Sequence, residues 1–316
     1  MKNIAIICSG GDVSGMNPAL KHFVEYTLKK GLQPFFVYNG YEGLIDNTIE
    51  PASYKNVAGI ITKGGTIIGS ARSKRFMSAE YRSIAKENLD KREITSLVVL
   101  GGDGSFRGLD LFYKEHGVAF CGIPSTIDND IHGTEYCLGV DTALNIIKGA
   151  IDAIRDTASS FHRAFVIETM GRNCGYLALV SHLTSGSELC LIPEKEYDLK
   201  EYEREFLKQI EQGRSYFIAI VSEGIKESSE DIANWFEEKL GVEARVSVLG
   251  HIQRGGNPSV YDRLMAYKFV HYALEGLLSG ETNSVICYTK EGFQYKSIEE
   301  VSSQSKQLDE ELLTFV

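Results

Sequence analysis

The sequence predicts an α/β fold made of two Rossmann-like three-layer lobes, with mainly parallel sheets and an active site in the cleft between the lobes. Two observations support this expectation. Short apolar runs alternate with helical stretches along nearly the whole chain, which is the pattern of parallel sheets covered by helices on both faces. A length of 316 residues is long for one core and suits two lobes, and a cleft between lobes is the usual place for a site.

The first half of the chain gives four strands and two helices. Apolar runs predict strands over residues 4–8, 33–38, 97–100 and 119–123. Apolar residues at helical spacing predict helices over residues 16–30 and 106–116. Residues 38–43 are rich in turn formers, and residues 64–72 are expected to form a flexible loop that ends in Arg72.

The second half continues the same alternation. We expect strands over residues 164–167, 189–192, 216–221, 244–249 and 284–288. We expect helices over residues 141–156, 175–183, 200–212, 229–240 and 259–278. No low-complexity linker separates these segments, so composition does not reveal a domain boundary.

Composition narrows the classes of function. Apolar residues make up 43% of the chain and charged residues 24%, which describes a soluble globular protein. A net charge of −10 disfavours nucleic acid and acidic membranes as partners, and a small anionic substrate would need local arginines. The chain enters a strand at once and has no long apolar run, so we expect no signal peptide, no membrane span and a cytoplasmic location. The six cysteines lack paired metal spacing and are expected to be core side chains.

The stretch over residues 97–130 concentrates the chemistry. The apolar run 97–100 leads into Gly101-Gly102-Asp103-Gly104-Ser105, where glycines and a following helix N-terminus would cradle phosphate. The next strand leads into Thr126-Ile127-Asp128-Asn129-Asp130. If this segment is extended, Asp128 and Asp130 lie on one side of it and converge with Asp103. Carboxylates beside phosphates indicate bound Mg²⁺ or a general base, although aspartate and glycine are also ordinary turn formers.

These two loops resemble the metal-phosphate loop and the catalytic loop of bacterial ATP-dependent 6-phosphofructokinases. The resemblance extends over nearly the whole chain, through the motifs at residues 9–12, 64–66, 69–72, 170–172 and 249–256. It implies transfer of the ATP γ-phosphoryl group to the 1-hydroxyl of fructose 6-phosphate, giving fructose 1,6-bisphosphate and ADP in glycolysis, with Mg²⁺ as cofactor. It also implies an ATP- and Mg-binding lobe of residues 1–139 and 253–303, and a sugar-phosphate lobe of residues 140–252 and 304–316.

The resemblance also implies residue roles. ATP and its metal would be bound by Gly11, Arg72, Ser73, Gly102, Asp103, Gly104 and Ser105. Asp128 would be the general base, assisted by Thr126, Arg172 and Gly11, while Asp130 would support the metal or the loop. Fructose 6-phosphate would be bound by Thr126, Asp128, Arg163, Met170, Gly171, Arg172, Glu223, Arg245, His251 and Arg254. Arg163 and Arg245 would reach into a neighbouring subunit, so the active site would be shared within a homotetramer.

Two alternatives stay open beside this interpretation. A diphosphate-dependent relative would be associated with aspartate at position 104 and lysine at position 125, whereas this chain has Gly104 and Ser125. Serine at 125 also replaces the usual glycine. A catalytically silent regulatory subunit would normally show a damaged catalytic loop, which is intact here. Lipid and NAD kinases share the glycine-rich loop but lack the second motif.

Regulation is the last expectation. Bacterial members commonly bind ADP or phosphoenolpyruvate at a second, basic site, and the matching positions here keep Lys21, Arg155, Glu188 and Arg214. Glu25 and Tyr54 stand where arginines are usual, and Tyr216 replaces a histidine. A glutamate in place of an arginine changes the local charge by two units, so we expect a weak response to these effectors, or none.

Overall fold

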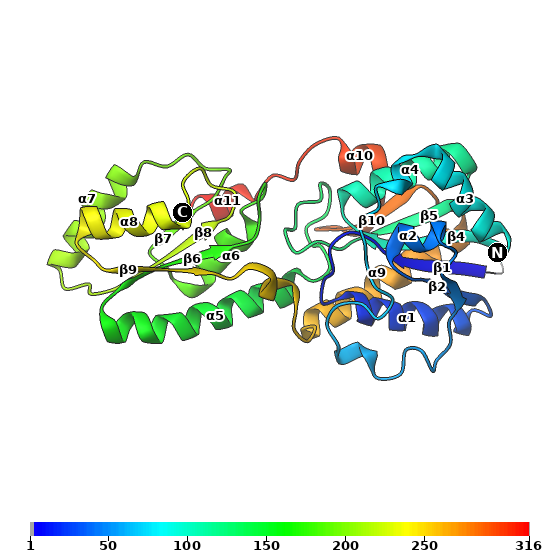
Figure 1. Ribbon diagram of the computed structural model, residues 1–316, viewed down its shortest axis with the longest axis horizontal. Coiled ribbons are helices and arrows are strands. Elements are labelled where there is room, and N and C mark those ends of the chain that lie inside the picture. Colours follow the sequence, from blue (N-terminus) through cyan, green and yellow to red (C-terminus); the bar gives the residue numbers. More distant parts are fainter. Residues whose placement is uncertain (1–2, 316) are drawn as a thin grey trace. The chain divides into compact units, whose positions relative to one another are not determined.

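The computed structural model describes residues 3–315, and the chain divides into two compact units. The first unit contains Met1–Thr142 and Arg254–Lys306, and the second contains Ala143–Gln253 and Gln307–Val316. The sequence expectation placed the crossings at residues 139, 253 and 303. Each unit is a sheet covered by helices, so the expected two-lobe α/β fold is confirmed (Figure 1).

The sheet of the first unit has seven strands in the order β11-β10-β5-β4-β1-β2-β3. Its parallel centre is formed by β10 (Ser284–Thr289), β5 (Ala119–Pro124), β4 (Ile94–Gly101), β1 (Asn3–Cys8) and β2 (Gln33–Val37). The two edge strands, β11 (Gly292–Ser297) and β3 (Ile49–Pro51), pair antiparallel with their neighbours and were not predicted. The central strands are almost wholly buried, as parallel strands covered on both faces must be.

Helices cover both faces of this sheet (Figure 1). On one face α1 (Met16–Lys29) packs beside α9 (Val260–Ser279), although these helices are far apart in the sequence. The other helices are α2 (Gly40–Ile45), α3 (Ala79–Asp90), α4 (Asp103–His116) and α10 (Ile298–Ser302), with short 3₁₀ turns at η1 (Ile60–Thr62) and η2 (Arg75–Met77).

Two local expectations in this unit were wrong. Residues 38–43 do not form a turn-rich exit, because α2 begins at Gly40. Its glycines are typical of turns and did not predict a helix. A Cβ at Gly43 would lie 1.8 Å from the Tyr38 carbonyl oxygen, so packing requires glycine there. Helix α4 begins at Asp103 rather than at residue 106, because extended Gly102 precedes a first turn whose aspartate stabilises the positive helix N-terminus.

The second unit has a four-stranded parallel sheet in the order β7-β8-β6-β9. Its strands are β7 (Leu189–Leu191), β8 (Phe217–Ser222), β6 (Ala164–Thr169) and β9 (Ala244–Val248). The helical elements are α5 (Val140–Phe161), α6 (Tyr176–Ser185), α7 (Leu199–Glu211), α8 (Ser229–Leu240), η3 (Gly250–Arg254) and α11 (Glu310–Leu313). The core that holds α7 and α8 on this sheet is aromatic: the ring of Phe206 lies 4.8 Å from Phe217 and 6.1 Å from Phe236.

The first sheet has a topological switch point between β1 and β4. The chain passes from β1 to β2 on one side, and from β4 to β5 on the other side. In open α/β sheets, ligands bind beyond the carboxyl ends of the strands at such a point. The glycine-rich loops after β1 and β4 lie there, so the topology brings together two predicted loops.

Two further expectations were tested. All six cysteines are buried, which confirms that they are core side chains. Among the residues that the structure describes, no helix is long and apolar enough to span a membrane.

Candidate active site

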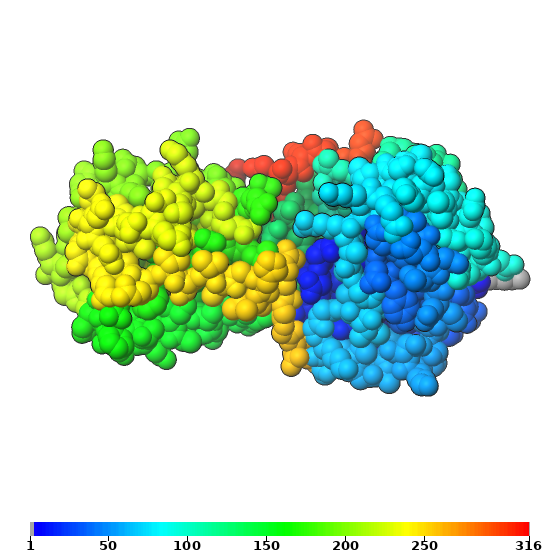
Figure 2. Space-filling model, in the orientation of Figure 1, coloured from blue at the N-terminus to red at the C-terminus, as the bar shows by residue number. Residues whose placement is uncertain are grey.

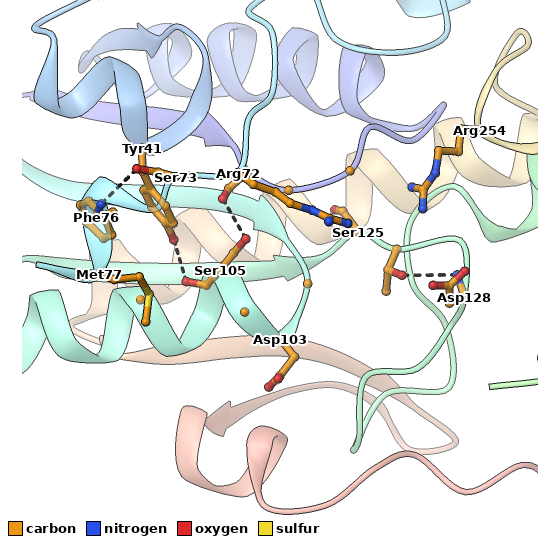
Figure 3. Close-up of a pocket in the computed structure, with 17 residues that line it drawn as sticks. Tyr41, Arg72, Ser73, Phe76, Met77, Asp103, Ser105, Ser125, Asp128 and Arg254 are labelled. Atoms are coloured by element: carbon orange, nitrogen blue, oxygen red, sulfur yellow. Dashed lines mark hydrogen bonds between the residues drawn. The ribbon is translucent and has the colours of Figure 1, made fainter. Parts of the chain in front are cut away.

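A pocket of about 330 Å³ lies at the switch point of the first unit (Figure 3). Ten of the predicted site residues line it: Gly11, Arg72, Ser73, Gly102, Asp103, Gly104, Ser105, Thr126, Asp128 and Arg254. They come from the loops after β1, β4 and β5, from the loop that precedes η2, and from η3. Segments far apart in the sequence therefore form one site within a single unit.

The N-terminus of α4 forms one wall of the pocket. Gly102, Asp103, Gly104 and Ser105 all lie at the start of this helix, where backbone N–H groups and the helix dipole favour an anion. A Cβ at Gly102 or Gly104 would meet no atom within 4 Å, so both glycines leave open space in front of the helix. The Ser105 hydroxyl donates to the Ser9 hydroxyl at 2.8 Å and ties the helix to the end of β1.

Gly11 and Arg254 meet on the neighbouring wall. A Cβ at Gly11 would lie 2.5 Å from a guanidinium nitrogen of Arg254, so only glycine leaves the arginine its present place. The Ser14 hydroxyl lies 2.8 Å from the Gly255 carbonyl and 3.0 Å from the Gly256 carbonyl, which fastens the Arg254 segment to the start of α1. In Figure 2 the dark blue N-terminal segment is seen beside gold atoms of this later segment.

Arg72 is the second cation of the pocket. Its neighbour Ser73 accepts a hydrogen bond from the Phe76 backbone N–H at 3.0 Å, which starts the turn η2. Arg75 in that turn forms ion pairs with Glu42 of α2 and with Asp46, which follows α2, but within residues 3–315 neither Arg72 nor Arg254 pairs with a carboxylate. Their guanidinium groups are therefore available to phosphate oxygens.

The segment that carries Thr126 and Asp128 is a turn, so the extended geometry expected from the sequence is wrong. The Asn129 N–H donates to the Thr126 carbonyl at 3.4 Å, and Asn129 has a φ of 52°. The Thr126 hydroxyl also accepts from the Asp128 N–H at 3.3 Å. Both Thr126 and Asp128 line the pocket, whereas Asp130 does not.

The expected convergence of three carboxylates is also wrong, because the turn separates Asp130 from Asp128. Among the described residues no group of three metal-ligating side chains is present. The pKa of Asp130 is raised, first by loss of water around its carboxyl and also by the negative charge of Asp103. Asp103 itself forms an ion pair with Arg107 at 2.9 Å and accepts a hydrogen bond from Ser302.

The far end of the pocket is apolar and aromatic, and the sequence analysis missed it. The rings of Tyr41 and Phe76 stack with centroids 4.1 Å apart and an interplanar angle of 7°. The buried Tyr41 hydroxyl donates to the Ser105 carbonyl at 2.6 Å, which links these rings to the helix N-terminus. Gly108 and Met77 complete this end. Tyr41 lies in the unpredicted helix α2, and no spacing in the sequence marked it.

Four other predicted residues come together in the second unit, at the carboxyl edge of its sheet. Met170, Gly171 and Arg172 follow β6, and Glu223 follows β8. The Glu223 N–H donates to the Thr169 carbonyl at 2.9 Å, and a Cβ at Gly224 would lie 1.9 Å from the Arg172 carbonyl. The side chains of Arg172 and Glu223 are exposed on these tightly packed loops.

Arg163 and Arg245 lie at the opposite edge of that sheet. Arg163 precedes β6 and Arg245 lies near the start of β9. Both arginines bind the carboxylate of Glu243, with Arg163 at 2.7 Å. The six residues of β6 separate Arg163 from Met170, which corresponds to roughly 20 Å. His251 lies in η3 with an exposed side chain and does not line the pocket.

The predicted effector residues are mostly paired with protein groups. Lys21 forms an ion pair with Glu25, one turn further along α1. In the second unit, Arg214 forms an ion pair with Glu188, and Arg155 donates to the Ser185 carbonyl at 2.7 Å.

Comparisons with known proteins agree with this geometry. The family model described as Phosphofructokinase matches residues 3–277. The chain is 69% identical to the ATP-dependent 6-phosphofructokinase of Sulfurimonas denitrificans, over 100% of this chain and 99% of that protein. It is 62% identical to the ATP-dependent 6-phosphofructokinase of a Sulfurovum species, over 99% and 96% of the two chains. The phosphofructokinase structure from Saccharomyces cerevisiae matches with a TM-score of 0.91 at 32% identity, over 96% of this chain and 45% of the yeast chain.

Proposed function

The chain belongs to the phosphofructokinase family, and we propose that it transfers the γ-phosphoryl group of ATP to the 1-hydroxyl of fructose 6-phosphate. The products are fructose 1,6-bisphosphate and ADP, which makes the protein a phosphotransferase of glycolysis. The observation that carries this proposal is the pocket of the first unit, where a helix N-terminus, two arginines without carboxylate partners and Asp128 line one space. We expect the enzyme to act in the cytoplasm, where its phosphorylated substrates occur.

Phosphoryl transfer requires a pocket that positions the reactants and neutralises the negative charge of the phosphates. The backbone of Gly11 and the first turn of α4 hold phosphate oxygens, while the aromatic end beside Phe76 accepts the base of the nucleotide. The Asp128 carboxylate removes the proton of the sugar 1-hydroxyl, and the hydroxyl oxygen bonds to the γ-phosphorus. The bond from the γ-phosphorus to the β,γ-bridging oxygen breaks, and that oxygen leaves with ADP. Arg72, together with Arg172 of the second unit in our proposal, offsets the charge on the transferring group.

Mg²⁺ fits the carboxylates of this site. Burial raises the pKa of Asp130, and the negative charge of Asp103 adds to the rise, so a divalent cation near Asp130 would favour its ionised form. Mg²⁺ commonly binds one or two carboxylates together with phosphate oxygens and water, so the absence of a third carboxylate among residues 3–315 does not disfavour it. Asp103 would hold the ion with support from Asp130, and bound Mg²⁺ would neutralise phosphate charge.

The open space at Gly104 favours ATP over diphosphate as the donor. A Cβ at this position would contact nothing within 4 Å, so a nucleotide has room where an aspartate would intrude. Ser125 is buried, and its hydroxyl donates to the Ile123 carbonyl at 3.1 Å. Because serine is uncharged, it adds no cation to the pocket. The silent-subunit alternative is disfavoured because Thr126 and Asp128 both line the pocket.

A coupled assay with ATP or diphosphate as the donor for fructose 6-phosphate tests the proposed function. We expect turnover with ATP and Mg²⁺ and none above background with diphosphate. Faster turnover with diphosphate would support the diphosphate-dependent alternative, and no turnover with either donor would support the silent subunit.

We propose a homotetramer with active sites shared between chains, to which Arg163 and Arg245 would contribute. Arg163 lies roughly 20 Å along β6 from Met170, and Arg245 pairs with Phe165 near the same end, so one sheet does not bring both groups to one phosphate. A second chain that presents its amino edge would supply the missing cations. Mixing Asp128→Ser chains with Arg163→Ser chains should then restore part of the activity, whereas no recovery in verified mixed oligomers would indicate sites built within one chain.

A weak effector response completes the proposal. Glu25 neutralises Lys21 through their ion pair, so the charge that would attract an anionic effector is already compensated. An effector that binds two states equally weakly supplies little free energy to shift between them.

A further inference from the structure

A buried side chain holds the turn that carries Thr126 and Asp128. Asn129 follows Asp128 directly, its relative exposure is 0%, and its φ of 52° is left-handed. Its Oδ1 accepts a hydrogen bond from the Cys137 N–H at 2.9 Å, and its Nδ2 donates to the Glu135 carbonyl at 3.1 Å. Asparagine tolerates this backbone conformation better than most residues. Asn129 thus fixes both the backbone of the turn and its distance from the loop over residues 134–142.

That loop is anchored in turn by Asp262, in the first turn of α9. Asp262 is fully buried and accepts hydrogen bonds from the Tyr136 hydroxyl at 2.6 Å, the Gly139 N–H at 2.6 Å and the Thr142 N–H at 2.8 Å. A carboxylate is acceptor-only and matches these converging donors. The connection therefore runs from a long helix, through one loop, to the turn that carries Asp128.

We propose that Asn129 is a positioning residue for phosphoryl transfer, which sets the direction of the Asp128 carboxylate, and that Asp262 supports it through the 134–142 loop. This inference rests on the proposed function, because Asp128 is the base of that reaction. A general base must stay within hydrogen-bond reach of its proton, and a displacement of about 1 Å costs on the order of 100-fold in rate. Nucleotide binding uses other segments of the pocket and should be spared.

Asn129→Gly tests the role of the side chain alone, because glycine adopts the left-handed backbone conformation but makes neither of the two side-chain hydrogen bonds. We expect kcat to fall by about 10- to 100-fold. The KM values and the affinity for ADP, measured by calorimetry, should stay within about threefold. Asn129→Asp keeps the acceptor for Cys137 but places a carboxylate oxygen against the Glu135 carbonyl, so its kcat should fall as well.

Asn88→Ala is the matched control. Asn88 is a buried amide of the same unit that donates to the Leu44 and Ile45 carbonyls at 2.9 and 3.1 Å and does not line the pocket. It should lose thermal stability and keep its kcat.

Four outcomes decide the matter. An Asn129→Gly kcat no lower than that of Asn88→Ala overturns the inference, and so does a raised KM with unchanged kcat. If Asn129→Gly does not fold, the same comparison of kcat with KM is made on Asn129→Asp. A wild-type kcat in that variant overturns the inference. A wild-type enzyme that fails to phosphorylate fructose 6-phosphate with ATP refutes the proposed function itself, before any variant is compared.

Discussion

The carboxyl edges of the two sheets differ in how complete a site one chain provides. At the first sheet, loops after β1, β4 and β5 converge on one pocket, and Ser14, Tyr41 and Asn129 hold its walls with hydrogen bonds. At the second sheet, Arg172 and Glu223 are exposed, while Arg163 and Arg245 lie at the opposite edge and bind Glu243. In the proposed reaction, one unit thus provides the residues for nucleotide binding, whereas binding of the sugar phosphate would draw on cations of a second chain.

The largest effect is expected from a substitution that inactivates the first site. Asp128→Ser removes the proposed general base, so kcat should fall by about 10² to 10⁴ while both KM values stay near those of the wild type. Steady-state kinetics check this, with Asp110→Ser as the control, because Asp110 is paired with Lys114 on α4 and does not line the pocket. A raised KM with unchanged kcat would contradict the assignment.

Gly104→Asp tests the open space in front of α4. The new carboxylate would face the phosphates, and two unit charges 4 Å apart at a protein surface interact by about 4 kcal/mol. We expect kcat/KM for ATP to fall by about 10- to 1,000-fold, with the melting temperature nearly unchanged. Gly149→Asp is the matched control, since Gly149 is an exposed glycine of α5 whose Cβ would also meet nothing within 4 Å. Equal losses in the two variants would show that the effect is not local to the pocket.

Arg163→Ser and Arg245→Ser test the second site. Each loses charged hydrogen bonds worth about 1.5 to 3 kcal/mol, so the KM for fructose 6-phosphate should rise roughly 10- to 150-fold. The KM for ATP should change little, because the proposal assigns Arg163 and Arg245 to sugar-phosphate binding alone. Arg204→Ser on α7 serves as the control, and an equal rise in both KM values would argue against a role in sugar-phosphate binding.

Effector control should be a smaller effect. Millimolar phosphoenolpyruvate or ADP should shift the half-saturating concentration of fructose 6-phosphate by less than about twofold, because Glu25 compensates Lys21. Glu25→Arg removes that compensation and should increase the shift. A several-fold shift in the wild type would show that Lys21, Arg155 and Arg214 suffice for binding.

The smallest effect concerns pH and Asp130. Its raised pKa means that the folded protein binds this proton more tightly than the unfolded chain, so ionisation of Asp130 lowers stability as the pH rises through that range. Asp130→Asn should therefore melt slightly above the wild type at pH 7, and the difference should shrink as the pH falls below the usual range of aspartate. Melting curves at several pH values without Mg²⁺ check this, and a constant difference would exclude the linkage.

The sequence predicted the glycine- and aspartate-rich end of the pocket better than the rest. Glycine and aspartate after apolar runs carried a strong local signal, so Gly102, Asp103 and Asp128 were found. The stacked rings of Tyr41 and Phe76 were missed because their role depends on contacts between separate segments. The positive φ of Asn129, which undid the predicted extended segment, depends on hydrogen bonds to Glu135 and Cys137 that no local pattern encodes. The pairing of Arg163 and Arg245 with Glu243 likewise requires the register of β6 and β9.

The bond between Ser14 and the Arg254 segment also has a consequence for synthesis of the protein. The hydroxyl of Ser14 reaches carbonyls that are 241 and 242 residues further along the chain. At a ribosomal rate of about 5 to 20 residues per second, these residues emerge roughly 10 to 50 seconds after Ser14. The nascent chain therefore carries the loops after β1, β4 and β5 before it carries Arg254, and neither β10 nor α9 is yet present to complete the sheet. The pocket is finished only when the last quarter of the chain returns to the first unit, so a ribosome-bound fragment lacks Arg254, one of the two arginines that line the pocket.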